Sequence, residues 1–202
     1  AHMAQHEILM LVAAPLLALS RPLTPFLWGM PFKWRRAIGR WSKTAAVQRG
    51  WRVIVEPGAA WCISAGALWA WHSPKLFQAT LTSDLVHTAQ HLSFFVSALL
   101  FWWSLLYSHG SLGYGGAVFY IFTTAIQTSI LGALLSFAPL VWYPAYQATA
   151  PIWGVTALKD QQLGGLIMWV PAGVVYLAAG LACSSAWLQQ SDAMLGRGQH
   201  VR

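Results

Sequence analysis

Long apolar segments are the feature that most restricts what this chain can fold into. Of its 202 residues, 57% are hydrophobic and only 8% are charged, whereas about a quarter of the residues in an ordinary soluble domain are charged. Several apolar segments approach the roughly 20 residues that a helix needs to cross a bilayer. The alternating, strand-length segments of a membrane barrel are absent from the sequence. The sequence therefore predicts an all-α fold, a polytopic bundle of transmembrane helices.

About five spanning helices are predicted, in a single transmembrane domain that covers residues 1–202. We expect them at about residues 2–20, 53–72, 84–107, 114–137 and 162–183. Ser83 and Asp84 are suitable N-cap residues for the third helix. Pro57 is tolerated in the first turn of the second, where a missing N–H costs little.

The basic residues indicate how these helices are oriented. Eight of the twelve lysines and arginines lie between Arg21 and Arg52, and such residues in short loops favour the cytoplasmic side. We therefore expect a basic cytoplasmic loop at 21–52 and an aromatic outer loop at 138–161. Because the net charge of +7 is explained by topology, no nucleic acid is expected as a partner. Contact of the basic loop with anionic headgroups of the lipid bilayer is expected.

Five of the seven histidines fall at the outer ends of the predicted helices. They are His2 and His6 in the first helix, His72 at the end of the second, and His87 and His91 in the third. The spacing of i, i+4 within each of the two pairs stacks both imidazoles on one helical face. A lone histidine near a membrane interface is more often an anchor or a hydrogen-bonding residue. Five histidines at one depth are a different case, because polar groups in apolar helices tend to face the bundle interior and to mark functional sites.

Copper is the leading candidate for an ion at these histidines. Imidazole suits copper, zinc, iron and nickel, while the thioether of methionine favours Cu(I). Met3 lies between the first two histidines, and Met168 lies in the fifth helix, where it suits core filling equally well. The predicted metal ligands are His6, His87, His91, His2, His72, Met3 and Met168. Three outer carboxylates, Glu7, Asp84 and Asp160, either orient the imidazoles as hydrogen-bond acceptors or cap helices.

Three segments of the chain carry a resemblance to a known family. Residues 2–6 read HMAQH, residues 87–91 read HTAQH, and residues 160–173 read DQQLGGLIMWVPAG. These segments resemble the signature segments of the CtaG-type cytochrome c oxidase assembly factors, over nearly the whole chain. The resemblance implies a multi-pass protein of the bacterial inner membrane that supplies or handles copper while haem-copper oxidase matures. An oxidase subunit and a periplasmic copper donor are the partners that it implies.

The resemblance also bears on the N-terminus. Family members usually carry further membrane segments before HMxQH, so we expect this chain to lack upstream helices. The tripeptide Ala1-His2-Met3 is also compatible with a cloning remnant, although Gln5 and His6 continue the family pattern. His2 and Met3 therefore rank below His6, His87 and His91 as ligands.

Two other functions remain open at this point. One is a membrane redox protein with a b-type haem between a histidine of the first helix and one of the third. The other is a metal or proton transporter that uses the same histidines as titrating groups. No triad, phosphate-binding loop or dinucleotide fingerprint is present, so no catalytic residues are assigned and an enzyme is not expected.

Overall fold

The computed structural model describes residues 2–147 and 150–199, and this part of the chain is all-helical, as predicted. Four of its helices are long and apolar enough to cross a membrane, and a bent pair of helices makes a fifth candidate span. The described part of the chain therefore has the helix lengths and composition of a membrane protein, with four or five candidate spans. Ala1 and residues 200–202, which belong to the predicted single domain, lie outside the described residues.

The first span is built from three helical segments. They are α1 (His2–Glu7), the π-helix η1 (Ile8–Ala13) and α2 (Ala14–Ser20). A π-helix is rare and is frequently found at functional sites. The indole Nε1 of Trp102, on a neighbouring helix, donates a hydrogen bond of 2.9 Å to the backbone carbonyl of Met10. This bond ties the widened turn to the bundle.

The other helices of the bundle follow the basic region. They are α6 (Pro57–Trp71), α7 (Pro74–Thr82), α8 (Asp84–Tyr107), α9 (His109–Ser136) and α10 (Ala157–Gln199). The bounds of α8 agree with the predicted span 84–107. Helix α6 begins at Pro57, later than the predicted residue 53, because the Glu56 side chain caps it by accepting a hydrogen bond from the Ala59 N–H at 2.9 Å. The bent pair that makes the fifth candidate span joins α5 (Ala45–Ile54) to α6. The long α10 extends well past the predicted end at residue 183.

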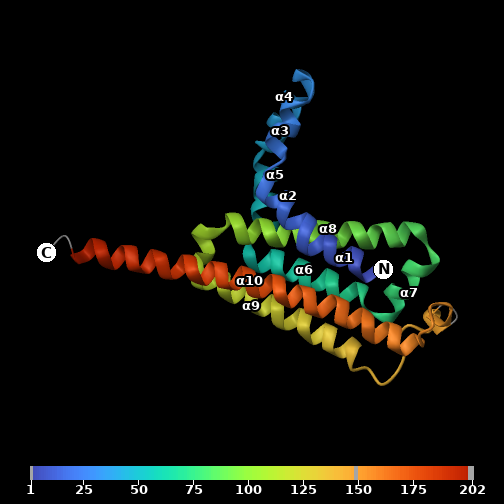
Figure 1. Ribbon diagram of the computed structural model, residues 1–202. Coiled ribbons are helices and arrows are strands. Elements are labelled where there is room, and N and C mark those ends of the chain that lie inside the picture. The colour runs from blue at the N-terminus through green and yellow to red at the C-terminus, as the bar shows by residue number, and fades with distance from the viewer. Residues whose placement is uncertain (1, 148–149, 200–202) are drawn as a thin grey trace.

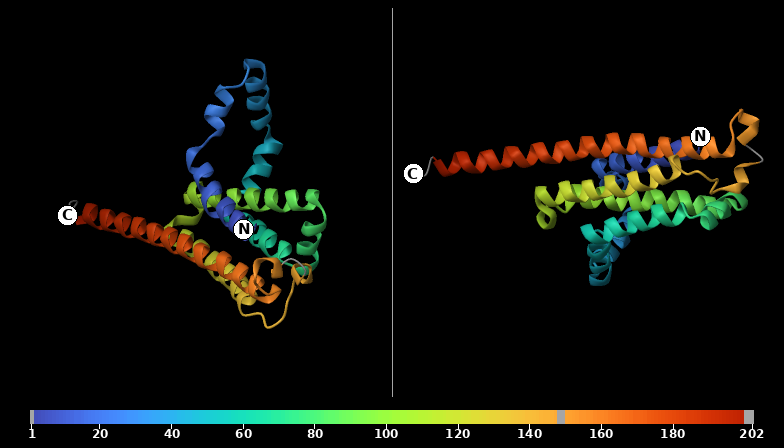
Figure 2. Two further views of the ribbon diagram at one scale, coloured as in Figure 1. Left: turned by 45° about the vertical axis from the view of Figure 1, so that its right-hand side comes forward. Right: turned by 90° about the horizontal axis from the view of Figure 1, so that it is seen from below.

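The interior of the bundle holds two clusters of buried side chains. The first core cluster is built around Leu11, Phe101, Trp102, Tyr120 and Tyr176. The second core cluster contains Leu68, Phe77, Phe94, Leu131, Leu135, Tyr143 and Met168. Helices α9 and α10 lie side by side along the bundle (Figure 2). Their closest approach uses small residues, since a Cβ on Gly132 would lie only 2.6 Å from the Cβ of Trp169.

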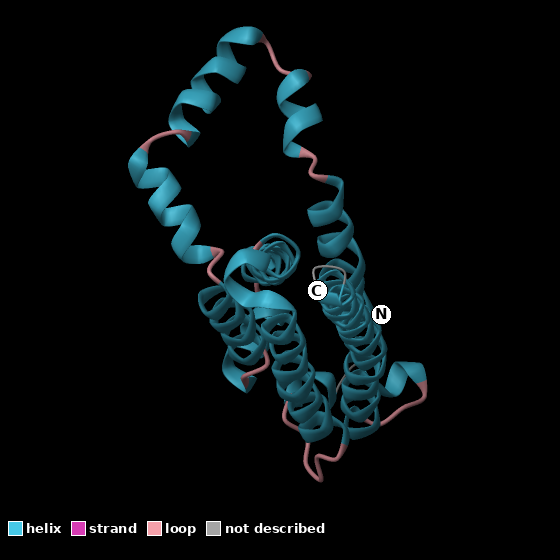
Figure 3. Cartoon of the chain, turned by 90° about the vertical axis from the view of Figure 1, so that its left-hand side faces the viewer, coloured by secondary structure: helices cyan, strands magenta, loops and turns pink. Residues whose placement is uncertain are grey.

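The basic region at 21–52 is not an irregular loop, because it folds into helices. It contains α3 (Leu23–Trp28), α4 (Phe32–Ser42) and α5 (Ala45–Ile54), which together form a hairpin that projects to the side of the bundle (Figures 1 and 3). Neither α4 nor α5 has a buried residue. Exposed tryptophans alternate here with lysines and arginines, which is typical of helices that lie in a membrane interface.

Candidate metal centre

Four imidazoles meet where α1 packs beside the first turns of α8. The Nε2 atom of His87 lies 2.8 Å from that of His2 and 2.9 Å from that of His91. The Nε2 atoms of His2 and His91 are 3.2 Å apart. His6 adds a fourth nitrogen, with its Nε2 3.3 Å from that of His91. The structure thus brings both predicted i, i+4 pairs to one point.

The four rings lie at different depths of burial. His2, His87 and His91 are partly exposed, whereas His6 is buried. The His6 ring packs edge-on against Phe94, with 4.8 Å between ring centroids. The cluster therefore has an accessible side, formed by three imidazoles, and an inner side closed by an aromatic ring.

The three mutual contacts among His2, His87 and His91 cannot all be hydrogen bonds between neutral imidazoles. Each Nε2 carries either one hydrogen or one lone pair, but not both. In a triangle of three such atoms, at least one pair must therefore face each other as two donors or as two acceptors. A cation at the centre removes this conflict, because all three nitrogens then direct lone pairs at it.

The spacing of the nitrogens fits a shared metal ion. Imidazole nitrogens bind zinc at about 2.0–2.1 Å, and at such a bond length the edge of a tetrahedron is about 3.3 Å. The observed separations of 2.8–3.3 Å are close to this value. The ligand atoms of His2, His87 and His91 all lie within 4.8 Å of one another. Copper, zinc, iron and nickel all accept an imidazole donor set.

His72, the fifth predicted histidine, makes no hydrogen bond to these four imidazoles within the described residues. It is buried, and its Nδ1 donates a hydrogen bond of 2.7 Å to the backbone carbonyl of Leu68. Its ring contacts Phe94 at a centroid distance of 6.0 Å. Phe94, which the sequence did not single out, therefore contacts both His6 and His72.

The two predicted methionine ligands contact the apolar core. Met168 is buried in the second core cluster, and Met3 packs against the same cluster. The Met3 Cγ also lies close to Gly164 of α10, 3.5 Å from where a Cβ would stand. These contacts match the packing role that the sequence left open for Met168.

The three predicted carboxylates make no hydrogen bond to an imidazole within the described ranges 2–147 and 150–199. Glu7 is buried, and its Oε2 has no hydrogen-bond partner there. Asp84 is exposed, and Asp160 is half-buried. The Nδ1 of His6 is likewise buried without a partner. The orienting role predicted for these carboxylates thus has no contact that supports it.

The predicted outer aromatic loop is attached to the bundle beside His72. It contains the short helices η2 (Pro144–Gln147) and η3 (Ala150–Trp153). The Tyr143 hydroxyl donates to the backbone carbonyl of His72 at 2.9 Å, and its ring stacks on Phe77. The Gln161 side chain accepts from the Trp142 N–H at 2.7 Å. Gln161 lies in the DQQLGG segment. The family resemblance of this segment was the only feature of the sequence that drew attention to Gln161.

Comparison with known proteins identifies a family for this chain. The model of the family described as cytochrome c oxidase caa3 assembly factor (Caa3_CtaG) matches residues 1–190. No curated protein and no solved structure matches the chain. The matched residues include all four converging imidazoles.

Proposed function

Because the chain belongs to the Caa3_CtaG family of cytochrome c oxidase caa3 assembly factors, we propose that it binds copper(I) at its imidazole cluster and hands the ion over while the oxidase matures. The observation that carries the proposal is the triangle of Nε2 atoms from His2, His87 and His91, 2.8–3.2 Å apart. The ion is cargo, so the chain performs no turnover chemistry of its own.

The difference in exposure among the imidazoles suits transfer of an ion. Three of the rings are partly exposed, so a donor group of a partner can approach the ion from that side. Each incoming ligand then replaces one imidazole at a time, and the ion never loses its whole shell. His6, on the buried side, is the last imidazole that the ion leaves.

The site lies on the outer face of a bacterial inner membrane in this proposal. The reason is the basic hairpin between Arg21 and Arg52, which favours the cytoplasmic side. The first span ends at this hairpin, so its other end, with the imidazoles, is then on the outer side. The partners are then an oxidase subunit as acceptor and a periplasmic copper donor.

A b-type haem is a weaker explanation of the same histidines. Haem would need its macrocycle between two opposed imidazoles, but the ring centroids of His2 and His87 are only 4.8 Å apart. We expect the purified protein to show stoichiometric copper and no Soret band. An intense Soret absorption, with haem extractable in a one-to-one ratio, would overturn the copper proposal.

A transporter is the other alternative for the same histidines. Copper-independent proton or metal flux in liposomes would favour a transporter instead.

Maturation of the oxidase gives the functional test. In a strain that lacks this protein, we expect the native chain to restore the copper content of the purified oxidase, and the variant His87→Ala/His91→Ala to fail. The physical reason is that two of the four converging imidazoles are lost. Copper analysis and haem spectra of the isolated oxidase measure the outcome. Full copper loading of the oxidase with the variant, at equal protein level, would refute the proposal.

A further inference from the structure

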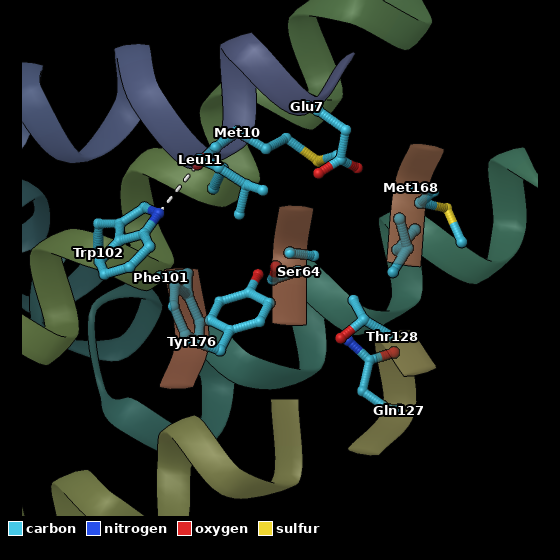
Figure 4. Close-up of a pocket in the computed structure, with 13 residues that line it drawn as sticks. Glu7, Met10, Leu11, Ser64, Phe101, Trp102, Gln127, Thr128, Met168 and Tyr176 are labelled. Atoms are coloured by element: carbon cyan, nitrogen blue, oxygen red, sulfur yellow. Dashed lines mark hydrogen bonds between the residues drawn. The ribbon is translucent and has the colours of Figure 1, made fainter. Parts of the chain in front are cut away.

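A small cavity lies in the centre of the bundle, deeper than the imidazoles. Its walls come from the first span and from α6, α8, α9 and α10, and its polar or sulfur-bearing lining residues are Glu7, Met10, Ser64, Gln127, Thr128, Met168 and Tyr176 (Figure 4). Its volume is about 20 Å³, enough for one water molecule or one ion. Met10 is four residues beyond His6, which corresponds to about 6 Å along a helix axis.

Glu7 is the unusual group in this cavity. Its side chain is only 7% exposed, and its Oε2 has no hydrogen-bond partner among the described residues. A buried carboxyl group inside a membrane span is costly unless it is paired, and such residues mark functional sites. The cavity offers Glu7 no lysine or arginine among its lining residues, so its carboxylate is neutralised either by a proton or by a bound cation.

The neighbour of Glu7 indicates which cation this is. Met10 lies three residues further along the same helical face, and the side chains of Glu7 and Met10 both line the cavity, with Met168 set apart from both in Figure 4. A thioether selects soft ions such as Cu(I). A single positive charge also neutralises one carboxylate, whereas a divalent ion would leave an unpaired charge in the apolar core.

We infer that Glu7 and Met10 form a second copper(I) site, one step deeper in the bundle than the imidazole cluster. This inference rests on the copper-handling function proposed above. The π-helix η1 holds Met10 in place, since the Met10 carbonyl accepts the hydrogen bond of Trp102. The bundle therefore offers copper(I) a nitrogen site near the surface and an oxygen and sulfur site inside.

Anaerobic titration of the full chain in detergent with Cu(I) tests this inference. We expect two ions per chain for the native protein, and one ion for Met10→Leu and for Glu7→Gln. Both substitutions nearly conserve volume and shape. X-ray absorption at the copper edge should show sulfur scattering in the native protein and lose it in Met10→Leu. Met30→Leu, in the hairpin between α3 and α4, is the matched control and should change neither result.

The outcomes separate this inference from the function that it rests on. A native protein that binds one ion, with nitrogen scattering alone, would overturn the inner site and leave the imidazole site standing. An unchanged stoichiometry and sulfur signal in Met10→Leu would also overturn it. Absence of any bound copper would refute the proposed function itself.

Discussion

Replacing His87 and His91 together by alanine is expected to remove most of the copper that the protein binds at its surface site. Both Nε2 atoms belong to the triangle with His2, with contacts of 2.8–3.2 Å. Loss of two of the four converging imidazoles should weaken binding by at least about a hundredfold, which corresponds to about 3 kcal/mol. Competition with a Cu(I) chelator of known affinity, using purified protein, measures the change.

The substitution should leave membrane insertion unchanged, because the apolar part of α8 is not altered. His109→Ala is the control, since this residue begins α9 at the far end of α8, away from the imidazole cluster. We expect native affinity for that variant. If the double variant keeps its surface copper with native affinity, the imidazoles are not the ligands and the site assignment fails.

The substitution Gly165→Ala is expected to destabilise the bundle strongly for the size of the change. A Cβ at this position would lie 2.6 Å from the Ser136 Oγ and 2.9 Å from the backbone oxygen of Gly132. Because a backbone atom cannot rotate away, α9 and α10 must move apart, and overpacking of this kind costs about 1–3 kcal/mol. Thermal unfolding of the detergent-solubilised protein should show a clearly lowered midpoint.

Gly173→Ala, on the same helix, is the matched control for this prediction. A Cβ there would meet no atom within 4 Å, so the midpoint should stay near the native value. Equal midpoints for the two variants would show that α9 and α10 can separate without cost. They would then contradict the close packing described here.

The sequence predicted the parts of the fold that depend on hydropathy and helical period. The bounds of α8 followed from a long apolar segment that begins after Ser83, which stands at the N-cap position, although its side chain makes no capping hydrogen bond. The i, i+4 spacing placed His87 and His91 on one face, and the same rule applied to His2 and His6. Their convergence could be expected because polar groups avoid lipid. That copper occupies the cluster stays a prediction.

Other features depend on contacts between distant residues, which periodicity does not encode. The π-helix η1 is held by a bond between Met10 and Trp102, 92 positions apart. The bond of His72 to Leu68 is local, but burial against Phe94 depends on how α6 meets α8. The helices of the basic region were not predicted. The lysines and arginines of this segment were used only to assign its side of the membrane, and its amphipathic helical pattern was not considered.

The 43 residues of α10 have a consequence for how far this helix reaches. A helix of this length is about 65 Å long, roughly twice the thickness of the hydrocarbon core. It starts beside the fastened outer loop, runs along α9, and extends beyond the bundle (Figure 1). Because Pro171 lies inside α10 and removes a backbone hydrogen bond, the helix is not a uniform rod, and bending at this point changes the direction of the part that extends beyond the bundle.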